Sequence, residues 1–265
     1  TVYVVTCNVG EWAGAKQLNV SKMVTDPNTD LNSFRPRIGP YDLVLGYYDE
    51  ALCMIDSMEH PVLRAVCMDI YQGLKDAWLT IPAAKGIHHA YVAGNLIHCV
   101  NVAKLAASIA HSLKANIDLC VAGALLHDVG KLLTYKWDGI RIDMTPYGQL
   151  VDHIVLGMNV VSGTCEGLGV PANIEMLLTH IIASHHGKKE YGSPVEPKCI
   201  EALIVHNADK LDADVEIIRA ASSADSVWTN KLFTLGNNSF LTEACVEKIL
   251  EAEELDASWE DDVAE

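Results

Sequence analysis

The sequence predicts a mainly α-helical fold, a helical bundle with a short N-terminal β segment. Two observations carry this prediction. From Tyr41 onward, apolar residues recur at helical spacing, and several prolines stand where helices would begin. Residues 1–25 instead hold alternating, β-branched runs, which are typical of a hairpin. We therefore expect four parts: a β segment at 1–25, a linker at 26–40, a helical domain at 41–240, and a short helix with an acidic tail at 241–265.

The N-terminal β segment is expected to pair the runs Thr1 to Val9 and Gln17 to Val24. Two strands do not form an independent domain. This segment is therefore either an appendage or the end of a larger β unit. The stretch 26–40 that follows is rich in Pro, Asn, Asp and Gly, the composition of a linker.

The helical domain is expected to contain seven helices, followed by a short one before the tail. Their expected ranges are 41–57, 61–79, 91–113, 117–127, 146–166, 171–186 and 197–221, with the short helix at 242–254. A hairpin is expected at 135–144, with Asp138-Gly139 as its turn. Gly130 is expected to end the helix that carries His127 and Asp128.

Composition narrows the class of protein. A chain of 265 residues can bury a full core. No apolar run approaches the 18 residues of a membrane span, and no secretory signal is recognisable, so we expect no membrane association. The eight cysteines show no C-x-x-C spacing, which indicates reduced thiols and a cytoplasmic location.

The formal net charge of −16 is uneven. Eight acidic residues lie from Glu251 onward, in a stretch without Lys or Arg. The rest of the chain is still acidic, which argues against broad electrostatic binding to duplex nucleic acid. A single strand end held by bound metal ions remains compatible with this charge.

The central motif is the stretch from Ala122 to Lys131, in which an apolar helix leads into His127 and Asp128. An imidazole beside a carboxylate can share one divalent cation, and the carboxylate is free to bridge to a second. Lys131 follows as a charge suited to a phosphate group. Roughly one His-Asp pair is expected by chance in such a chain, so the pair indicates a metal site only if further ligands can reach it.

Further ligand candidates lie on other predicted helices. They are His98, His153, His185, His186 and Asp209. A lone helical histidine is more often structural than a ligand. Several histidines among apolar neighbours on different helices indicate a metal site, because buried ionisable groups are costly unless they pair or bind metal. Helical bundles build metal centres from facing helices.

These residues resemble a known family. His98, His127-Asp128 and Asp209 are similar to the H…HD…D signature of HD-domain metal-dependent phosphohydrolases. Four stretches resemble the YhaM-type subfamily of 3′-to-5′ exoribonucleases, and they are 88–98 (HHAYVAGNLIH), 127–131 (HDVGK), 145–157 (TPYGQLVDHIVLG) and 184–213. That subfamily carries an N-terminal OB-fold that grips single strands, of which only the last strands could correspond to residues 1–25, so this segment would be an incomplete OB-fold. Asp152 stands where the subfamily commonly has Gly.

The resemblance implies an HD-domain helical bundle with two metal sites. Asp128 would bridge them, His98, His127 and Asp209 would complete the first, and His153, His185 and His186 would form the second. The cofactors would be two or more divalent transition metal ions, Mn²⁺ foremost, with Fe, Co, Ni, Zn or Mg as alternatives. Asp128 and Lys131 are the candidate catalytic residues.

Substrate contacts are expected from two loops. The candidates are His88, His89, Tyr91, Lys188, Lys189, Tyr191 and Ser193. His180 is expected to be structural, and Asp212 and Asp214 are expected to orient neighbouring groups or to face water.

Three functions fit this pattern. The first is a metal-dependent phosphodiesterase, a 3′-to-5′ exonuclease that acts on RNA or single-stranded DNA and releases nucleoside monophosphates. The second is hydrolysis of a small nucleotide (a triphosphate, monophosphate or cyclic nucleotide) at the same centre. The third is a non-catalytic nucleic-acid-binding accessory protein. The expected partners are single-stranded nucleic acid or a nucleotide, and a second copy of the chain in a homo-oligomer.

Overall fold

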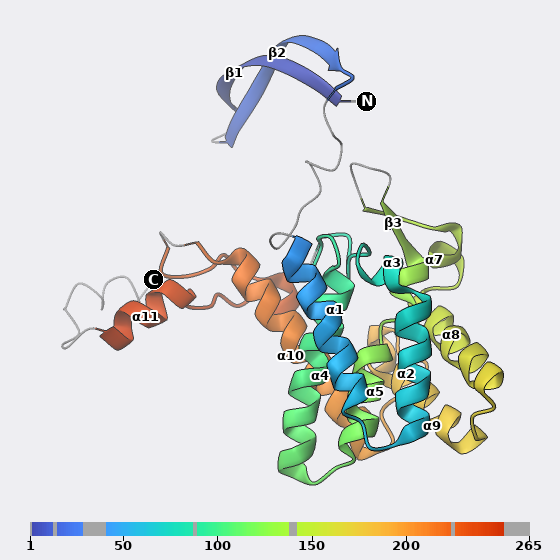
Figure 1. Ribbon diagram of the computed structural model, residues 1–265. Coiled ribbons are helices and arrows are strands. Elements are labelled where there is room, and N and C mark those ends of the chain that lie inside the picture. The colour runs from blue at the N-terminus through green and yellow to red at the C-terminus, as the bar shows by residue number, and fades with distance from the viewer. Residues whose placement is uncertain are drawn as a thin grey trace.

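The computed structural model describes residues 2–12, 15–28, 41–86, 89–137, 142–223 and 226–251. These residues are mainly helical and carry a short N-terminal hairpin, so the predicted fold class is confirmed (Figure 1). The α-helices are α1 (Tyr41–Asp56), α2 (Pro61–Gly73), α3 (Lys75–Trp78), α4 (Gly94–Leu113), α5 (Ile117–Leu126), α6 (Lys131–Thr134), α7 (Pro146–Leu150), α8 (His153–Leu168), α9 (Ala172–Ser184), α10 (Ile200–Ala221) and α11 (Glu243–Glu251). The strands are β1 (Val2–Trp12), β2 (Ala15–Asp26), β3 (Tyr135–Trp137) and β4 (Ile142–Met144), and two 3₁₀ turns are η2 (Lys189–Tyr191) and η3 (Phe233–Leu235).

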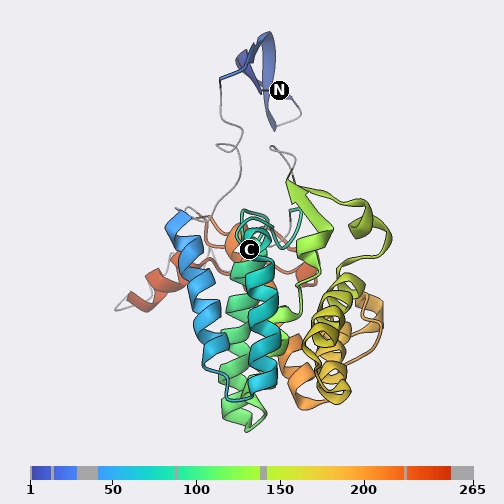
Figure 2. The ribbon, with the colours of Figure 1, turned by 45° about the vertical axis from the view of Figure 1, so that its right-hand side comes forward.

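The N-terminal hairpin lies apart from the helical body in both ribbon views (Figures 1 and 2). β1 and β2 pair antiparallel from Val2 opposite Asp26 to Trp12 opposite Ala15, so the strands are longer than predicted. Many of their apolar side chains are exposed to solvent, including that of Val9. Residues 29–40 of the predicted linker lie outside the described part of the chain, and the four-part domain division stays a prediction.

α5 is the central helix of the body. Its eight residues from Leu119 to Leu126 are all buried. The helix begins where the Asn116 side chain accepts a hydrogen bond from the Leu119 backbone N–H at 2.8 Å, which satisfies one of the unpaired amides of the first turn. Because the whole helix is buried, the residues that directly follow it, His127 and Asp128, also lie deep in the protein.

The other helices surround α5. α4 and α10 pack against it and against each other, and α1 and α2 stand alongside α4 and α5 (Figure 2). α8 and α9 pack together beside α2 and α5. By length and composition α4 could cross a membrane, but half of its apolar window is buried, as is usual for a core helix.

The predicted helix 146–166 is wrong as one element, because the structure divides it into α7 and α8. The break lies at Asp152, whose φ of 67° is in the region that favours glycine. The Asp152 side chain accepts a hydrogen bond from the His153 backbone N–H at 2.6 Å and caps α8. His153 is therefore the first residue of a helix and does not lie inside one.

Other predicted boundaries also shift. The predicted helix 61–79 is two helices, α2 and α3, separated at Leu74. α4 begins at Gly94 and not at Tyr91, because Ala93 adopts a left-handed conformation with φ of 60°. The hairpin at 135–144 is confirmed by pairing of Tyr135 with Met144. Its turn, Asp138-Gly139, lies outside the described residues.

Gly130 does not end a helix in the way predicted. Its φ is −64°, an ordinary helical value, and the chain turns directly from His127 into α6. What requires a glycine here is space. A Cβ atom at position 130 would lie 1.9 Å from the His153 carbonyl oxygen and 2.5 Å from the Gly157 backbone nitrogen. The absence of a side chain lets the first turn of α8 approach Asp128.

Candidate metal centre

All seven predicted metal ligands converge on one place in the fold. α4 supplies His98, the end of α5 supplies His127 and Asp128, the start of α8 supplies His153, the end of α9 supplies His185 and His186, and α10 supplies Asp209. The side chains of His98, His127, Asp128 and His185 are almost completely buried. The fold thus gathers ligands separated by up to 111 positions in the sequence (98 to 209) around the Asp128 carboxylate.

The first site is the group formed by Asp128 Oδ2, His98, His127 and Asp209. His98 Nε2 lies 3.1 Å from Asp209 Oδ1 and 3.2 Å from His127 Nε2. His127 Nε2 lies 3.3 Å from Asp128 Oδ2. Ligand atoms of His98, His127 and Asp128 all lie within 4.8 Å of one another, a spacing that fits a single cation.

The second site is the group formed by Asp128 Oδ1, His153, His185 and His186. Asp128 Oδ1 lies 3.6 Å from both His153 Nε2 and His185 Nε2. These three buried atoms have no hydrogen-bond partner among the residues that the structure describes. Buried polar atoms are rarely left without partners, and a cation bound between them would satisfy all three. The two carboxylate oxygens of Asp128 therefore face two separate groups of ligands.

The opposite nitrogen of each imidazole, Nδ1, is occupied by a hydrogen bond. In His127, His185 and His186 it donates to the backbone carbonyls of Ala124, Ile182 and Tyr191 at 2.7, 2.7 and 3.0 Å. In His153 and His98 it donates to the carboxylates of Asp152 and Asp212 at 2.8 and 2.7 Å. Such partners fix the tautomer and leave the Nε2 lone pair for a metal. All five rings are thus oriented as metal ligands.

The electrostatics of the two sites differ. Burial alone would lower the pKa of His98, but its hydrogen bonds to Asp209 and Asp212 outweigh burial and raise that pKa. His127 shows the same balance, with Asp128 as the main source of the upward pKa shift. In the second site burial dominates and lowers the pKa of both His185 and His186. The first site is therefore more strongly anionic than the second.

This difference predicts that cation binding at the first site releases protons. Metal ligands must be deprotonated, and His98 and His127 hold protons above the ordinary pKa of about 6.5. Affinity at the first site is therefore expected to rise as the pH increases above about 6.5, whereas affinity at the second site, where burial lowers the pKa of His185 and His186, changes less. Calorimetric titration with Mn²⁺ in buffers of different ionisation enthalpy measures the protons released. A binding enthalpy independent of the buffer would contradict the prediction.

Lys131 lies beside the shared carboxylate. Its Nζ is 2.6 Å from Asp128 Oδ2, and its side chain is 10% exposed. Burial alone would lower the pKa of this amine, but Asp128 outweighs burial and raises it, so Lys131 is charged. It is not a solvated residue at a helix end.

A cavity of about 330 Å³ opens beside the first site. Its lining comes from the centre and from the segments around it, and consists of Asp128, Lys131, His186, Tyr191, His206, Asp209, Lys210, Ala213, Asp214 and Thr234. His206 Nδ1 donates to the His185 carbonyl oxygen at 2.6 Å, so this ring is held next to the second site. The cavity gives a substrate access to Lys131 and to both carboxylates of the first site.

The structure places some of the predicted substrate residues at the cavity and others away from it. Tyr191 lines the cavity, and Lys188 lies nearby, with its Nζ 5.6 Å from the centre of the Tyr191 ring. Lys189 is exposed on η2, whereas Ser193 is buried. His89 and Tyr91 are absent from the cavity lining and lie behind His98, where His89 contacts Asp212. His88 lies outside the described residues.

Several residues of the cavity lining were not predicted from the sequence. His206 and Lys210 flank Asp209 on α10, and the pair Lys210 and Asp214 has the spacing of a helical ion pair, so helical periodicity could have indicated them. Thr234 comes from η3, far along the chain, and nothing in the sequence connects it to the centre. His180 is structural as expected, because its Nε2 accepts from the Lys198 backbone N–H at 2.9 Å.

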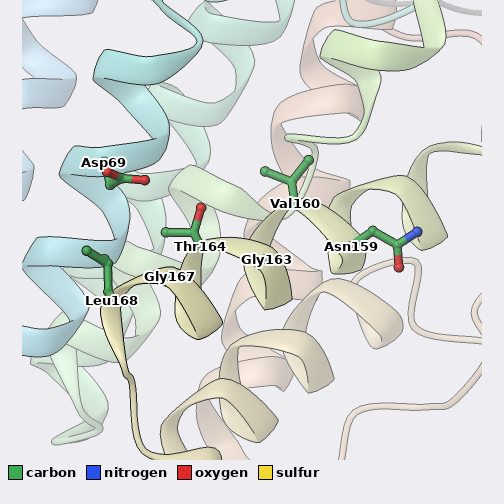
Figure 3. A pocket seen from close by; sticks show the side chains of 7 residues that line it. All are labelled: Asp69, Asn159, Val160, Gly163, Thr164, Gly167 and Leu168. Carbon is green, nitrogen blue, oxygen red and sulfur yellow. The ribbon is translucent and has the colours of Figure 1, made fainter.

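A second hollow lies between α2 and α8 and shares no residue with the metal centre. Figure 3 shows its lining, with Asp69 on α2 and Asn159, Gly163 and Thr164 among the residues of α8. Its side chains offer no histidine or cysteine ligand. The described ligand groups therefore lie elsewhere, around Asp128 and His98.

Residues 95–214 match the family model of the HD domain. This span contains every predicted metal ligand from His98 to Asp209 and includes Lys131. This part of the chain is therefore similar to HD domains, and an HD domain implies metal-dependent phosphohydrolase activity in general. The His/Asp clusters fit the divalent metals that such domains bind. No solved structure matches the chain significantly.

Proposed function

We propose that this protein is a metal-dependent phosphodiesterase that shortens single-stranded RNA or DNA from the 3′ end and releases nucleoside monophosphates. The observation that carries the proposal is the position of Asp128, whose two oxygens face two groups of histidine ligands. Two cations held by these ligand groups would activate a water and would stabilise the phosphoryl oxygens during in-line displacement. We propose Mn²⁺ as the metal, with Fe, Co, Ni, Zn or Mg as alternatives.

The chain's own residues suit a phosphoester. Lys131 is charged and lines the cavity, so its Nζ is placed to donate to a non-bridging phosphate oxygen. Asp128 and Lys131 hold each other in place through their ion pair. Tyr191 is 59% exposed at the cavity rim, where its ring can stack on a nucleobase.

The size and surroundings of the cavity favour one nucleotide at a time. About 330 Å³ is near the lower end of small-ligand pockets. Exposed Lys188 and Lys189 beside Tyr191 offer positive charge to the phosphates that follow the terminal one. These features support cleavage at a strand end.

The alternative is hydrolysis of a small nucleotide at the same centre. The net charge of −16 favours it, because an acidic surface repels a long polyanion. The accessory-protein function is a weaker candidate, since structural metal sites are usually closed, whereas this centre adjoins a cavity. We further propose a cytoplasmic location without membrane association, in keeping with free cysteines at all eight positions, and assembly into homo-oligomers.

Product analysis tests the proposal. A 5′-labelled single-stranded RNA and its DNA counterpart are incubated with Mn²⁺ and resolved by length, beside a panel of free nucleotides. The proposal predicts a ladder that shortens from the 3′ end, with nucleoside monophosphates as products. Intact strands together with a hydrolysed nucleotide would instead establish the small-nucleotide alternative. Strand binding without any hydrolysis would support the accessory protein.

Removal of metal is expected to stop hydrolysis and to lower thermal stability. A ligand that binds only the folded state stabilises it by about 2.7 kcal/mol at one hundred times its dissociation constant. We therefore expect a chelator to lower the melting temperature and Mn²⁺ to restore it along with activity. Differential scanning calorimetry measures this shift, with added Na⁺ as the control. Unchanged activity after metal content has been shown to be zero would contradict the proposal.

A further inference from the structure

A chain of buried hydrogen bonds lies behind His98, on the side away from the cations. Asp212 Oδ2 accepts from His98 Nδ1 at 2.7 Å and from His89 Nε2 at 2.8 Å. His89 Nδ1 lies 2.5 Å from the Tyr91 hydroxyl oxygen. His89 is 3% exposed, and the Asp212 side chain is 12% exposed. The loop before α4 and the middle of α10 thus meet at one carboxylate.

The directions of these hydrogen bonds are determined by the carboxylate. Asp212 Oδ2 lies within hydrogen-bond distance of one imidazole nitrogen from each of two rings, and a carboxylate in that position accepts from both. His98 then donates from Nδ1 and presents Nε2 to the first site. His89 donates from Nε2 to Asp212, and its Nδ1 is paired with the Tyr91 hydroxyl.

The backbone of the loop is shaped to bring His89 to this place. His89 and Ala93 both have positive φ, 46° and 60°, conformations that are unfavourable for residues with a side chain. A Cβ atom at Gly94 would lie 1.9 Å from the His89 carbonyl oxygen, so only glycine permits this approach. The surrounding structure therefore maintains two unfavourable conformations in the segment that supplies His89 and Tyr91.

His98 is held differently from the other four imidazole ligands. Three of those donate to backbone carbonyls, and His153 donates to Asp152, whose side chain is 69% exposed. His98 alone among the five donates to a mostly buried carboxylate that a further imidazole also holds. A carboxylate behind a metal-bound imidazole raises the basicity of that ligand and fixes its ring.

We propose that Asp212, His89 and Tyr91 are positioning residues for the first site. Asp212 orients His98 for the cation, and His89 and Tyr91 hold the Asp212 carboxylate. The proposal rests on the proposed function only in assuming that His98 is a metal ligand. The ligand atoms of His89, His98 and Asp212 also lie within 4.8 Å of one another, so a third cation there is the competing interpretation.

The test is to count the sites and measure their affinities separately. Mn²⁺ binding to the full chain is followed by equilibrium dialysis and by electron paramagnetic resonance for the unmodified protein and for Asp212→Asn, His89→Gln and Tyr91→Phe. The loss of such a partner typically weakens metal binding 10- to 100-fold. We expect a loss of this size at one site in Asp212→Asn, a smaller loss in the other two variants, and an unchanged second site in all three.

Glu201→Gln is the matched control, since this carboxylate also lies on α10 but accepts from the Asn116 backbone N–H far from the centre. It should bind both cations with unchanged affinity. Two intact sites in Asp212→Asn, or equal loss of both sites, would overturn the proposal. So would three Mn²⁺ ions in the unmodified protein and two in Asp212→Asn, which would establish the third cation site. Because binding is measured without substrate, absence of hydrolysis would overturn the proposed function and leave this inference standing.

Discussion

Replacing Asp128 with alanine is expected to abolish hydrolysis and to remove both bound cations together. Asp128 is the one predicted ligand whose two oxygens face both sites, with Oδ2 3.3 Å from His127 Nε2 and Oδ1 3.6 Å from His185 Nε2. The replacement also leaves Lys131 charged, buried and without its 2.6 Å partner, at a cost of about 3–5 kcal/mol in folding free energy. Activity, metal content and the free energy of unfolding are measured on the same preparation.

A second variant separates loss of chemistry from loss of the fold. Asp128→Asn keeps the shape of the side chain but only one oxygen, so we expect a folded protein that has lost at least one cation and its activity. Asp69→Ala is the control, because Asp69 lines the hollow of Figure 3, away from the metal centre. It should retain activity and metal. Full activity in Asp128→Ala would refute the catalytic role of the centre.

The second large effect, on stability and on cation affinity, is expected from replacing Gly130, a residue that has no side chain to bind a metal. In Gly130→Ala the new Cβ atom would lie 1.9 Å from the His153 carbonyl oxygen. Cβ has a fixed position on the backbone and its neighbours here are backbone atoms, so no side-chain rotation relieves the clash and α8 must move away from Asp128. Overpacking of this kind costs about 1–3 kcal/mol, and we expect a loss at the upper end. Because His153 begins α8, its Nε2 leaves the second site, and affinity for the second cation falls with stability.

Gly163→Ala is the matched control for this prediction. Gly163 lies within α8 and lines the open hollow in Figure 3, where a Cβ atom would meet nothing within 4 Å. Alanine in an unobstructed helix position is expected to stabilise the protein by about 0.4–1 kcal/mol. Chemical denaturation of the two variants compares their free energies of unfolding. Equal stabilities would show that close packing at Gly130 is unimportant.

Much of the fold was predictable because local rules determine it. The helical spacing of apolar residues after Tyr41 identified the main helices. Proline marked the starts of α2 and α7 correctly, because it suits a first helical turn. The uninterrupted apolar run of α5 indicated a central helix.

The breaks in the helices were less predictable. Asp152 stands between two apolar helical patterns, and its positive φ is imposed by packing that the sequence does not display. From the sequence alone, a glycine at position 130 fits either the end of a helix or a place where another segment packs closely against the backbone. Only the position of α8 decides between them. These differences arise where one element must fit another.

The candidate metal ligands could be recognised in the sequence because their chemistry is unusual. Histidines and aspartates among apolar helical neighbours are costly unless they are paired or bound, so His98, His153 and Asp209 were recognisable. The structure brings them together around Asp128, and their role as ligands stays a prediction. The cavity lining was less predictable from the sequence, because it combines η3 with α10, which come together only in the tertiary fold. The place of His89 behind His98 depends on two strained residues.

The most direct measurement is the anomalous scattering of crystals soaked in Mn²⁺. Two strong peaks are expected, one on either side of the Asp128 carboxylate. One should lie near His98, His127 and Asp209 and the other near His153, His185 and His186. Their presence would establish the two-metal centre on which the proposed chemistry depends. The absence of peaks at Asp128, at Mn²⁺ concentrations that support activity, would contradict it.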